Sequence, residues 1–335
     1  DPNQIPVLEE RTDTVNHKEW LSVKTNADNY LKKIETNPDD INSKLKLAEL
    51  YVQEARNTGN YSYYDGAVLQ LINSVLANPQ IDKGARNAEM KFQALAIKSL
   101  IYLNQHHFAE GLQIAEQARK VNPHNSFMYG CLVDANIELG KYDVALRMAD
   151  TMCAIRPDLR SYSRISYLRE INGNNRGAIE AMTLAVQAGV PGLEETEWAR
   201  VHLGKLYENV GSVDTAEILY NMAMHYRKDY PFAVAGLARV ATAKKDYSKA
   251  VKYYQTACKH MDNSGFADDL TNAYRWNNQP EKADKNAKIV IESLNQISTI
   301  GDNENEIGHF ADMELAHAYL KTNDYEKALK HAKIE

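Results

Sequence analysis

The sequence predicts an all-α protein built from repeated pairs of helices. One phrase recurs along the chain, as "GKYDVALRMADTM" at 140–152, "KDYSKAVKYYQTA" at 245–257 and "NDYEKALKHAKIE" at 323–335. Small and apolar residues recur within each copy at the spacing of a helix face. Gly and Pro number 16 and 9, too few for many long loops. The chain contains no apolar run of the length that spans a bilayer.

A small residue three positions after the start of each second helix marks the copies. Successive intervals are 44, 34, 33, 38, 34, 33 and 45 residues, so a basic period of 33 to 34 residues carries local insertions. Four and seven residues beyond the mark stand further apolar residues, such as Tyr254 and Ala257. The eight marked positions are Ala67, Gly111, Ala145, Ala178, Ala216, Ala250, Ala283 and Ala328.

Each copy is predicted to be a helix, a short turn such as "LGKYD" or "TNDY", and a second helix. Ala or Gly at the crossing point lets two antiparallel helices approach closely. An aromatic residue three positions earlier, such as Tyr64, Tyr142 or Tyr325, is expected to plug the start of the second helix. One pair cannot bury its apolar face alone, so stacked pairs are expected to form an elongated solenoid.

In chain order, residues 1–40 are predicted to be a free leader, "DPNQIPVLEE", and a capping helix within "NADNYLKKIETNP". Residues 41–335 are predicted to hold the helix pairs. The first pair carries an insertion of about seven residues around "RNTGNYSYY", and the last stops inside its second helix. Asn175 and Pro280 replace the aromatic plug in the fourth and seventh pairs. Longer loops are expected at "PQIDKGARNA", "GVPGLEET" and "NQISTIGDNENEIG".

These offsets of small and aromatic residues resemble the tetratricopeptide repeat (TPR) family, over about 41 to 335. The resemblance implies a right-handed α-α superhelix of about eight repeats. It also implies a non-enzymatic scaffold that binds a peptide or protein segment on the concave face, which first helices form. Family members that grip chaperone C-termini use a Lys and Asn clamp on these helices. The matching positions here, such as Leu45 with Glu49, do not supply that clamp.

The usual signatures of catalysis and cofactor binding are missing. The sequence contains no HExxH, GxSxG, GxxxxGK[ST] or GxGxxG motif, so neither an enzyme nor a cofactor is predicted. "GNNRG" at 173–177 is interpreted as a turn between helices. The net charge of -6 provides no basic field for nucleic acid.

No metal site is predicted either. The three cysteines lack CxxC spacing, and the histidine pair at 106–107 has no further ligand at a useful spacing. The acidic segment "GDNENEIG" at 301–308 faintly resembles a calcium loop, but the glycine and glutamate that such a loop requires are out of place.

The middle first helices carry a basic and aromatic strip in this acidic protein. Guanidinium groups fork onto carboxylates and aromatic rings clamp peptides, so the strip predicts an acidic peptide as partner. The alternative is that these charges solvate the face and pair with nearby Glu170 or Glu208. The predicted partner-binding residues are Arg160, Arg164, Tyr167, Trp198, His202, Lys205, Phe232, Arg239, Asn272 and Trp276.

Other functions stay open. Trp198, Trp276 and Tyr167 could serve as stacking platforms in an envelope solute- or glycan-binding protein, whose binding would survive high salt. The incomplete last repeat fits a regulatory module of a longer protein, or self-association through an uncapped end. The missing initial Met and the Asn- and Tyr-rich composition favour an exported bacterial cell-envelope or periplasmic protein, with a lipid anchor before Asp1, over a cytoplasmic one.

Overall fold

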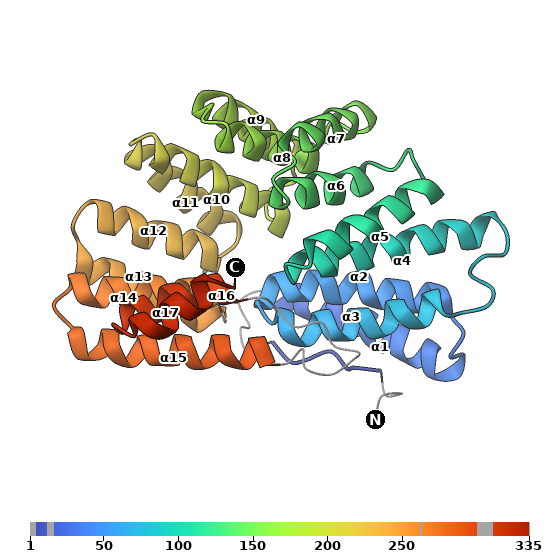
Figure 1. The fold of residues 1–335 in the computed structure, drawn as a ribbon, viewed down its shortest axis with the longest axis horizontal. Coiled ribbons are helices and arrows are strands. Elements are labelled where there is room, and N and C mark those ends of the chain that lie inside the picture. Colours follow the sequence, from blue (N-terminus) through green and yellow to red (C-terminus); the bar gives the residue numbers. More distant parts are fainter. Residues whose placement is uncertain (1–4, 12–16, 262, 300–310, 335) are drawn as a thin grey trace. The chain divides into compact units, whose positions relative to one another are not determined.

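A computed structural model describes residues 5–11, 17–261, 263–299 and 311–334 of the chain. Over these ranges it contains seventeen α-helices and no strand (Figure 1). The predicted all-α fold of repeated helix pairs is therefore confirmed. The chain divides into two compact units, Asp1–Gly173 and Asn174–Glu335, which we call the N-terminal and the C-terminal unit.

The N-terminal unit contains α1 to α8. Helix α1 packs on α2, and the pairs α2 with α3, α4 with α5 and α6 with α7 follow, before α8 packs on α6 and α7. The bounds are α1 His17–Thr36, α2 Ile41–Thr58, α3 Tyr61–Leu76, α4 Ala85–Asn104, α5 Phe108–Val121, α6 Ser126–Glu138, α7 Tyr142–Ile155 and α8 Leu159–Ile171. Helix α1 occupies the place of the predicted capping helix and begins earlier in the sequence than its apolar pattern indicated.

The C-terminal unit begins with α9, which packs on α10. Four helix pairs follow: α10 with α11, α12 with α13, α14 with α15, and α16 with α17. The bounds are α9 Asn175–Ala188, α10 Glu194–Asn209, α11 Val213–Tyr226, α12 Pro231–Ala243, α13 Tyr247–His260, α14 Ser264–Trp276, α15 Pro280–Thr299, α16 Asp312–Lys321 and α17 Tyr325–Ala332. The boundary between the units thus lies inside the predicted fourth pair, in the turn between α8 and α9.

The small residues that mark the repeat lie where the sequence pattern places them. All eight are buried, and each lies on the second helix of its pair. Two glycines lie against the ring of Tyr220, which sits between Gly204 of α10 and Gly236 of α12. A methyl group would lie 2.5 Å from Cε1 of Tyr220 at Gly204, and 2.7 Å from the same ring at Gly236. Because both positions are glycine, the two first helices leave room for one aromatic ring on the second helix between them.

The predicted aromatic plug is wrong at two positions. Tyr142 and Tyr325 do not plug their repeats, because they are 50% and 64% exposed. Tyr64, at the same offset, is buried as predicted. The predicted insertion at "RNTGNYSYY" is mostly helical, since α2 continues to Thr58 and α3 begins at Tyr61 after a left-handed turn at Gly59 with φ of 80°. The extra residues therefore lengthen the helices.

The leader is not free along its described part. Tyr51 donates a hydrogen bond to the carbonyl oxygen of Pro6, and Tyr63 donates one to that of Val7, both at 2.6 Å. Residues 5–11 thus dock on α2 and α3. Their partners lie more than 40 residues away in sequence, so no local pattern revealed the contact. The acidic "GDNENEIG" segment lies outside the described residues.

The turn at "GNNRG" is confirmed as a connection between helices. Gly173 has φ of 76°, a left-handed conformation that glycine adopts without steric cost. Asn174 then caps α9, because its side-chain oxygen accepts a hydrogen bond from the backbone N–H of Gly177 at 2.9 Å. Across the part of the chain that the structure describes, no helix is long and apolar enough to cross a membrane.

Candidate functional site

The predicted strip residues all lie on first helices. Arg160, Arg164 and Tyr167 stand on α8 of the N-terminal unit. In the C-terminal unit, α10 carries Trp198, His202 and Lys205, α12 carries Phe232 and Arg239, and α14 carries Asn272 and Trp276. We call the surface of α10, α12 and α14 that carries these seven residues the first-helix face of the C-terminal unit. Each unit is described separately below.

Arg164 is held by the first helix of the preceding repeat. Its Nε donates to Oδ1 of Asp134 at 2.9 Å and its Nη2 to Oδ2 at 2.5 Å, so the pair is bidentate. The same Nε lies 3.2 Å from the carbonyl oxygen of Gly130. A Cβ at Gly130 would come within 2.9 Å of the guanidinium carbon, so glycine makes room for this side chain. Arg164 is therefore largely committed to an internal ion pair.

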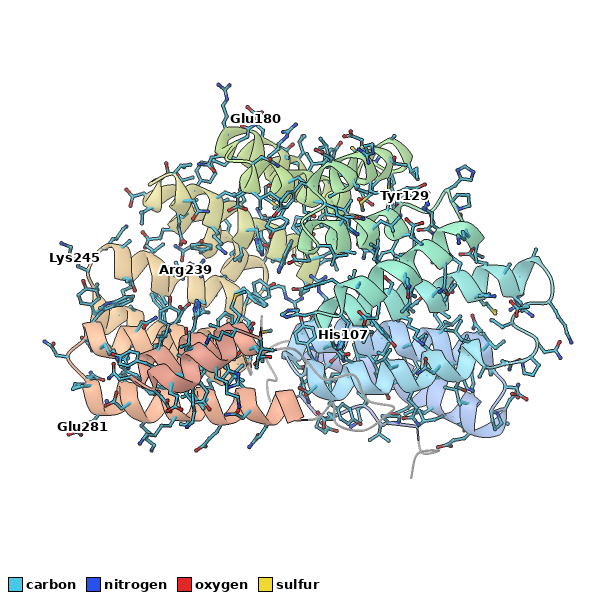
Figure 2. The ribbon with its side chains drawn as sticks, in the orientation of Figure 1. His107, Tyr129, Glu180, Arg239, Lys245 and Glu281 are labelled. Carbon is cyan, nitrogen blue, oxygen red and sulfur yellow. The ribbon has the colours of Figure 1, made fainter. Side chains whose placement is uncertain are left out.

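Arg239, which is labelled in Figure 2, is also bound within the protein. Its Nε donates to Oε2 of Glu208 at 2.9 Å, and its Nη2 donates to the Tyr220 hydroxyl at 3.0 Å. Pairing with Glu208 is the alternative that the sequence had left open, and the structure confirms it. The guanidinium links α10, α11 and α12, so it contributes to packing between repeats.

A phenolic group and a carboxyl group from two further helices lie near this contact. Burial alone would lower the pKa of Arg239, but Tyr220 and Glu208 hold it above its ordinary value. Burial raises the pKa of Tyr254 on α13, and also that of Asp269 on α14, although Arg239 acts in the opposite direction on both. The positive charge of Arg239 is therefore neutralised in part by the carboxylate of Glu208.

The aromatic residues of the first-helix face differ in their surroundings. Trp198 and His202, one turn apart on α10, have ring centroids 3.8 Å apart. Phe232 packs against the core, with Phe266 at 5.4 Å, so less of its ring faces a partner than the sequence suggested. Trp276 is 50% exposed and lies 6.2 Å from the ring of Tyr247. Tyr167, on α8 of the other unit, is 44% exposed.

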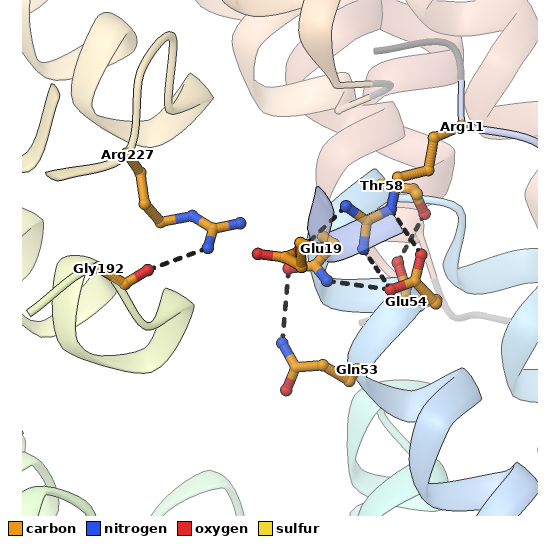
Figure 3. Close-up of polar contacts among 8 residues, drawn as sticks. Arg11, Glu19, Gln53, Glu54, Thr58, Gly192 and Arg227 are labelled. Atoms are coloured by element: carbon orange, nitrogen blue, oxygen red, sulfur yellow. Dashed lines mark hydrogen bonds and ion pairs between the residues drawn. The ribbon is translucent and has the colours of Figure 1, made fainter. Parts of the chain in front are cut away.

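Sequence reasoning missed a second cluster in the N-terminal unit, around Arg11. Figure 3 shows its guanidinium facing the carboxylates of Glu54 and Glu19. Nε and Nη2 of Arg11 donate to Glu54 at 2.8 and 2.5 Å, and Nη1 donates to Glu19 at 3.0 Å. Glu54 follows Arg11 by 43 residues, and a lone Arg in a leader carries no signal that would have identified the pair.

The described residues offer little support for a metal site or for a nucleophilic cysteine at Cys131. Among them, no three His, Cys, Asp or Glu side chains are grouped so that they could hold a metal ion. Cys131 is buried, and burial raises the pKa of its thiol to about 12, which disfavours the nucleophilic thiolate.

Comparisons with known proteins show the fold. No family model matches the sequence, and no curated protein matches it. Among solved structures, a chain of the APC/C hetero-tetramer Cut9-Hcn1 aligns with 95% of this chain at a TM-score of 0.57 and 16% identity. This chain spans 56% of that protein's length.

Two bacterial proteins align with smaller parts of the chain. PilF of Pseudomonas aeruginosa covers 62% of this chain and 93% of its own, with a TM-score of 0.49 and 12% identity. TTC0263, a TPR protein of Thermus thermophilus, covers 61% of this chain and 98% of its own, with a TM-score of 0.48 and 20% identity.

The paired helices, their order and the likeness to the Cut9-Hcn1 chain define an all-α helix-repeat protein. The period of 33 to 34 residues and the burial of all eight marker residues on second helices are those of one repeat type. The protein has the tetratricopeptide repeat fold, as the sequence resemblance implied.

Proposed function

We propose that this protein is a non-enzymatic interaction scaffold that holds a peptide or protein segment on the first-helix face of its C-terminal unit. The observation that supports this most is the half-exposed indole of Trp276 on α14. Large aromatic side chains that stay open to water are enriched among the residues that anchor binding partners. Helical repeat arrays with this architecture use such surfaces for binding rather than for catalysis.

The charge of the partner is the finer part of the proposal. Arg239 already binds Glu208, so an added carboxylate would gain little from it. Lys205 on α10 is exposed on the same face. An acidic segment of the partner would therefore meet Lys205, while its apolar side chains cover Trp276 and the Trp198–His202 pair. Added salt should weaken the contact with the lysine, whereas the contacts with the aromatic rings should persist.

The test compares matched variants in a pull-down from native extract with quantified recovery of each captured protein. Trp276→Ala is expected to reduce recovery of the main partner at least fivefold. Tyr142→Ala is the control, because Tyr142 is equally exposed but lies on the second helix α7. Equal recovery by both variants would remove the support for this face.

Two variants that reverse a charge test whether the partner is acidic. Lys205→Glu is expected to weaken capture of the same partner, most clearly at low salt. Lys252→Glu makes the same change at an exposed position of the second helix α13 and should leave capture unchanged. If neither variant alters recovery while Trp276→Ala does, the partner is held by apolar contacts and is not acidic.

Self-association through the last repeat is proposed separately. Tyr325 and Leu329, one turn apart on α17, and Leu320 at the end of α16 are exposed apolar residues. A second copy that covers them would remove this surface from water. Analytical ultracentrifugation should then show a dimer that Leu329→Glu converts to a monomer, whereas a wild-type chain that is monomeric at 100 μM, roughly the range of weak interfaces, would contradict it.

A further inference from the structure

Residues 5–11 lie on the N-terminal unit in the manner of a bound peptide. The hydroxyl groups of Tyr51 and Tyr63 hold the segment through the carbonyl oxygens of Pro6 and Val7. A hydroxyl that donates to a main-chain carbonyl binds the backbone and is indifferent to the side chain attached to it. These contacts would therefore serve any extended segment of suitable length.

The side chains of the segment are only partly buried, with Ile5, Pro6 and Leu8 half-buried. Val7 is 57% exposed, and Glu9 and Glu10 are also exposed. Their contacts are polar and lie at the surface: Asn60 donates to Glu9 at 2.6 Å, and Lys24 pairs with Glu10. Exposed pairs of this kind contribute at most about 1 kcal/mol. These exposed pairs therefore add little to the partial burial that holds the segment in place.

Arg11 provides the anchor. Its side chain is 8% exposed, and that of Glu54 is fully buried. The guanidinium binds Glu54 through two nitrogens and Glu19 through the third, and it lies 5.5 Å from the ring centroid of Trp20. The N–H donors at the edge of the guanidinium thus bind both carboxylates, while the guanidinium also lies near the indole ring. We call Glu19, Trp20 and Glu54 the guanidinium pocket.

The charge of the pocket demands a cation. Glu54 and Glu19 both present a carboxylate to the guanidinium of Arg11, and the side chain of Glu54 is fully buried. Burial lowers the pKa of Arg11, but the hydrogen bond and charge of Glu54 outweigh this effect and raise it overall. Without Arg11, the buried Glu54 would keep Asn57 as a donor at 3.1 Å but would lose its counter-ion, which is costly inside a protein.

We propose that α1, α2 and α3 form a binding site for an extended, arginine-bearing peptide, and that residues 5–11 occupy this site as an intramolecular ligand. The guanidinium pocket selects the arginine, while Tyr51 and Tyr63 hold the backbone that precedes it. A partner segment gains access by displacing residues 5–11. This site lies on the N-terminal unit and is independent of the first-helix face proposed above.

The test measures binding of a fluorescently labelled peptide, IPVLEER, which has the sequence of residues 5–11, to the full chain by anisotropy. In the wild type, the covalently attached segment competes at an effective concentration on the order of millimolar. Arg11→Ala is expected to bind the peptide at least tenfold more tightly than the wild type. Lys46→Ala, which removes a cation from the exposed Lys46–Glu49 pair on α2, should bind like the wild type.

Peptide variants separate the parts of the proposal. IPVLEEA should lose at least tenfold in affinity for Arg11→Ala, and IPVLEEK should lie between the two because lysine lacks the fork. Equal binding of IPVLEEA and IPVLEER overturns the guanidinium pocket as the selective element. If free L-arginine competes as strongly as the unlabelled peptide, the backbone contacts contribute nothing, and an extended peptide is not the ligand.

A second variant covers the case in which Arg11→Ala fails to fold, as judged by circular dichroism. Arg11→Lys keeps the counter-ion of Glu54 but weakens the intramolecular ligand, so it should bind IPVLEER several-fold more tightly than the wild type. Absence of any gain in whichever of the two variants is folded overturns the proposal.

Discussion

Arg239 donates a hydrogen bond of 2.9 Å from its Nε to Oε2 of Glu208 on the first helix of the preceding repeat. Arg164 makes the corresponding connection to Asp134 in the other unit. In both cases, an arginine that the sequence marks as a ligand for a partner holds two neighbouring repeats together. Arg164 and Arg239 therefore contribute first to stability.

Replacing Arg239 should destabilise the protein through the carboxylate it leaves behind. Arg239→Ala removes both hydrogen bonds and leaves Glu208, which is only 16% exposed, without its counter-ion. We expect a loss of roughly 2 kcal/mol in the free energy of unfolding, less than for a fully buried pair. Urea denaturation of Arg239→Ala, Glu208→Gln and the double variant forms a mutant cycle. Additive losses would show that the two residues do not interact energetically.

Two Gly→Ala substitutions should have opposite effects on stability, because only one of them crowds the Tyr220 ring. Gly236→Ala places a methyl group 2.7 Å from the buried Tyr220 ring and should cost about 1 to 3 kcal/mol from overpacking. Gly66→Ala, inside α3, meets no atom within 4 Å and should gain about 0.5 to 1 kcal/mol from helix propensity. Thermal unfolding measures both, and a stabilised Gly236→Ala would contradict the packing seen here.

Asp65 should make stability depend on pH. It is buried on α3, and burial raises the pKa of its carboxyl to about 7, although a hydrogen bond with Gln105 acts in the opposite direction. Because the folded state holds this proton more tightly than the unfolded chain, with its pKa near 3.8, the stabilisation is complete below about pH 4. It is lost as the pH rises towards 7, at up to about 1 kcal/mol per pH unit.

The Asp65→Asn variant isolates this effect. It should be at least as stable as the wild type at pH 8 and should lose its advantage as the pH falls to 5. The difference in melting temperature between the two proteins, measured from pH 5 to 8, cancels the titration of other groups. A difference that stays constant over this range would show that Asp65 does not titrate there.

Much of the fold could be predicted from the sequence because the repeat is local. A small residue at a crossing point and apolar residues four and seven positions later report the face of a single helix, and all eight marker residues are buried as predicted. The failures at Tyr142 and Tyr325 have a different cause. Burial at that offset depends on which neighbouring helix covers the side chain, and the repeat pattern does not contain that information.

The candidate sites were less predictable than the fold. The strip residues do lie on first helices, as the periodicity indicated. Their availability depends on partners that stand about 30 residues away, such as Asp134 for Arg164 and Glu208 for Arg239. The sequence allowed pairing with Glu208 and did not decide between pairing and a free charge.

The sequence by itself determined the helices, their pairing and the positions of the small residues between them, because these depend on a pattern that recurs within each repeat. Only the tertiary structure decided which charges are neutralised and where residues 5–11 lie. The contact between Arg11 and Glu54 joins residues 43 positions apart, outside the repeat period. Such contacts depend on the folded positions of α1 and α2, which place two carboxylates and an indole around one guanidinium.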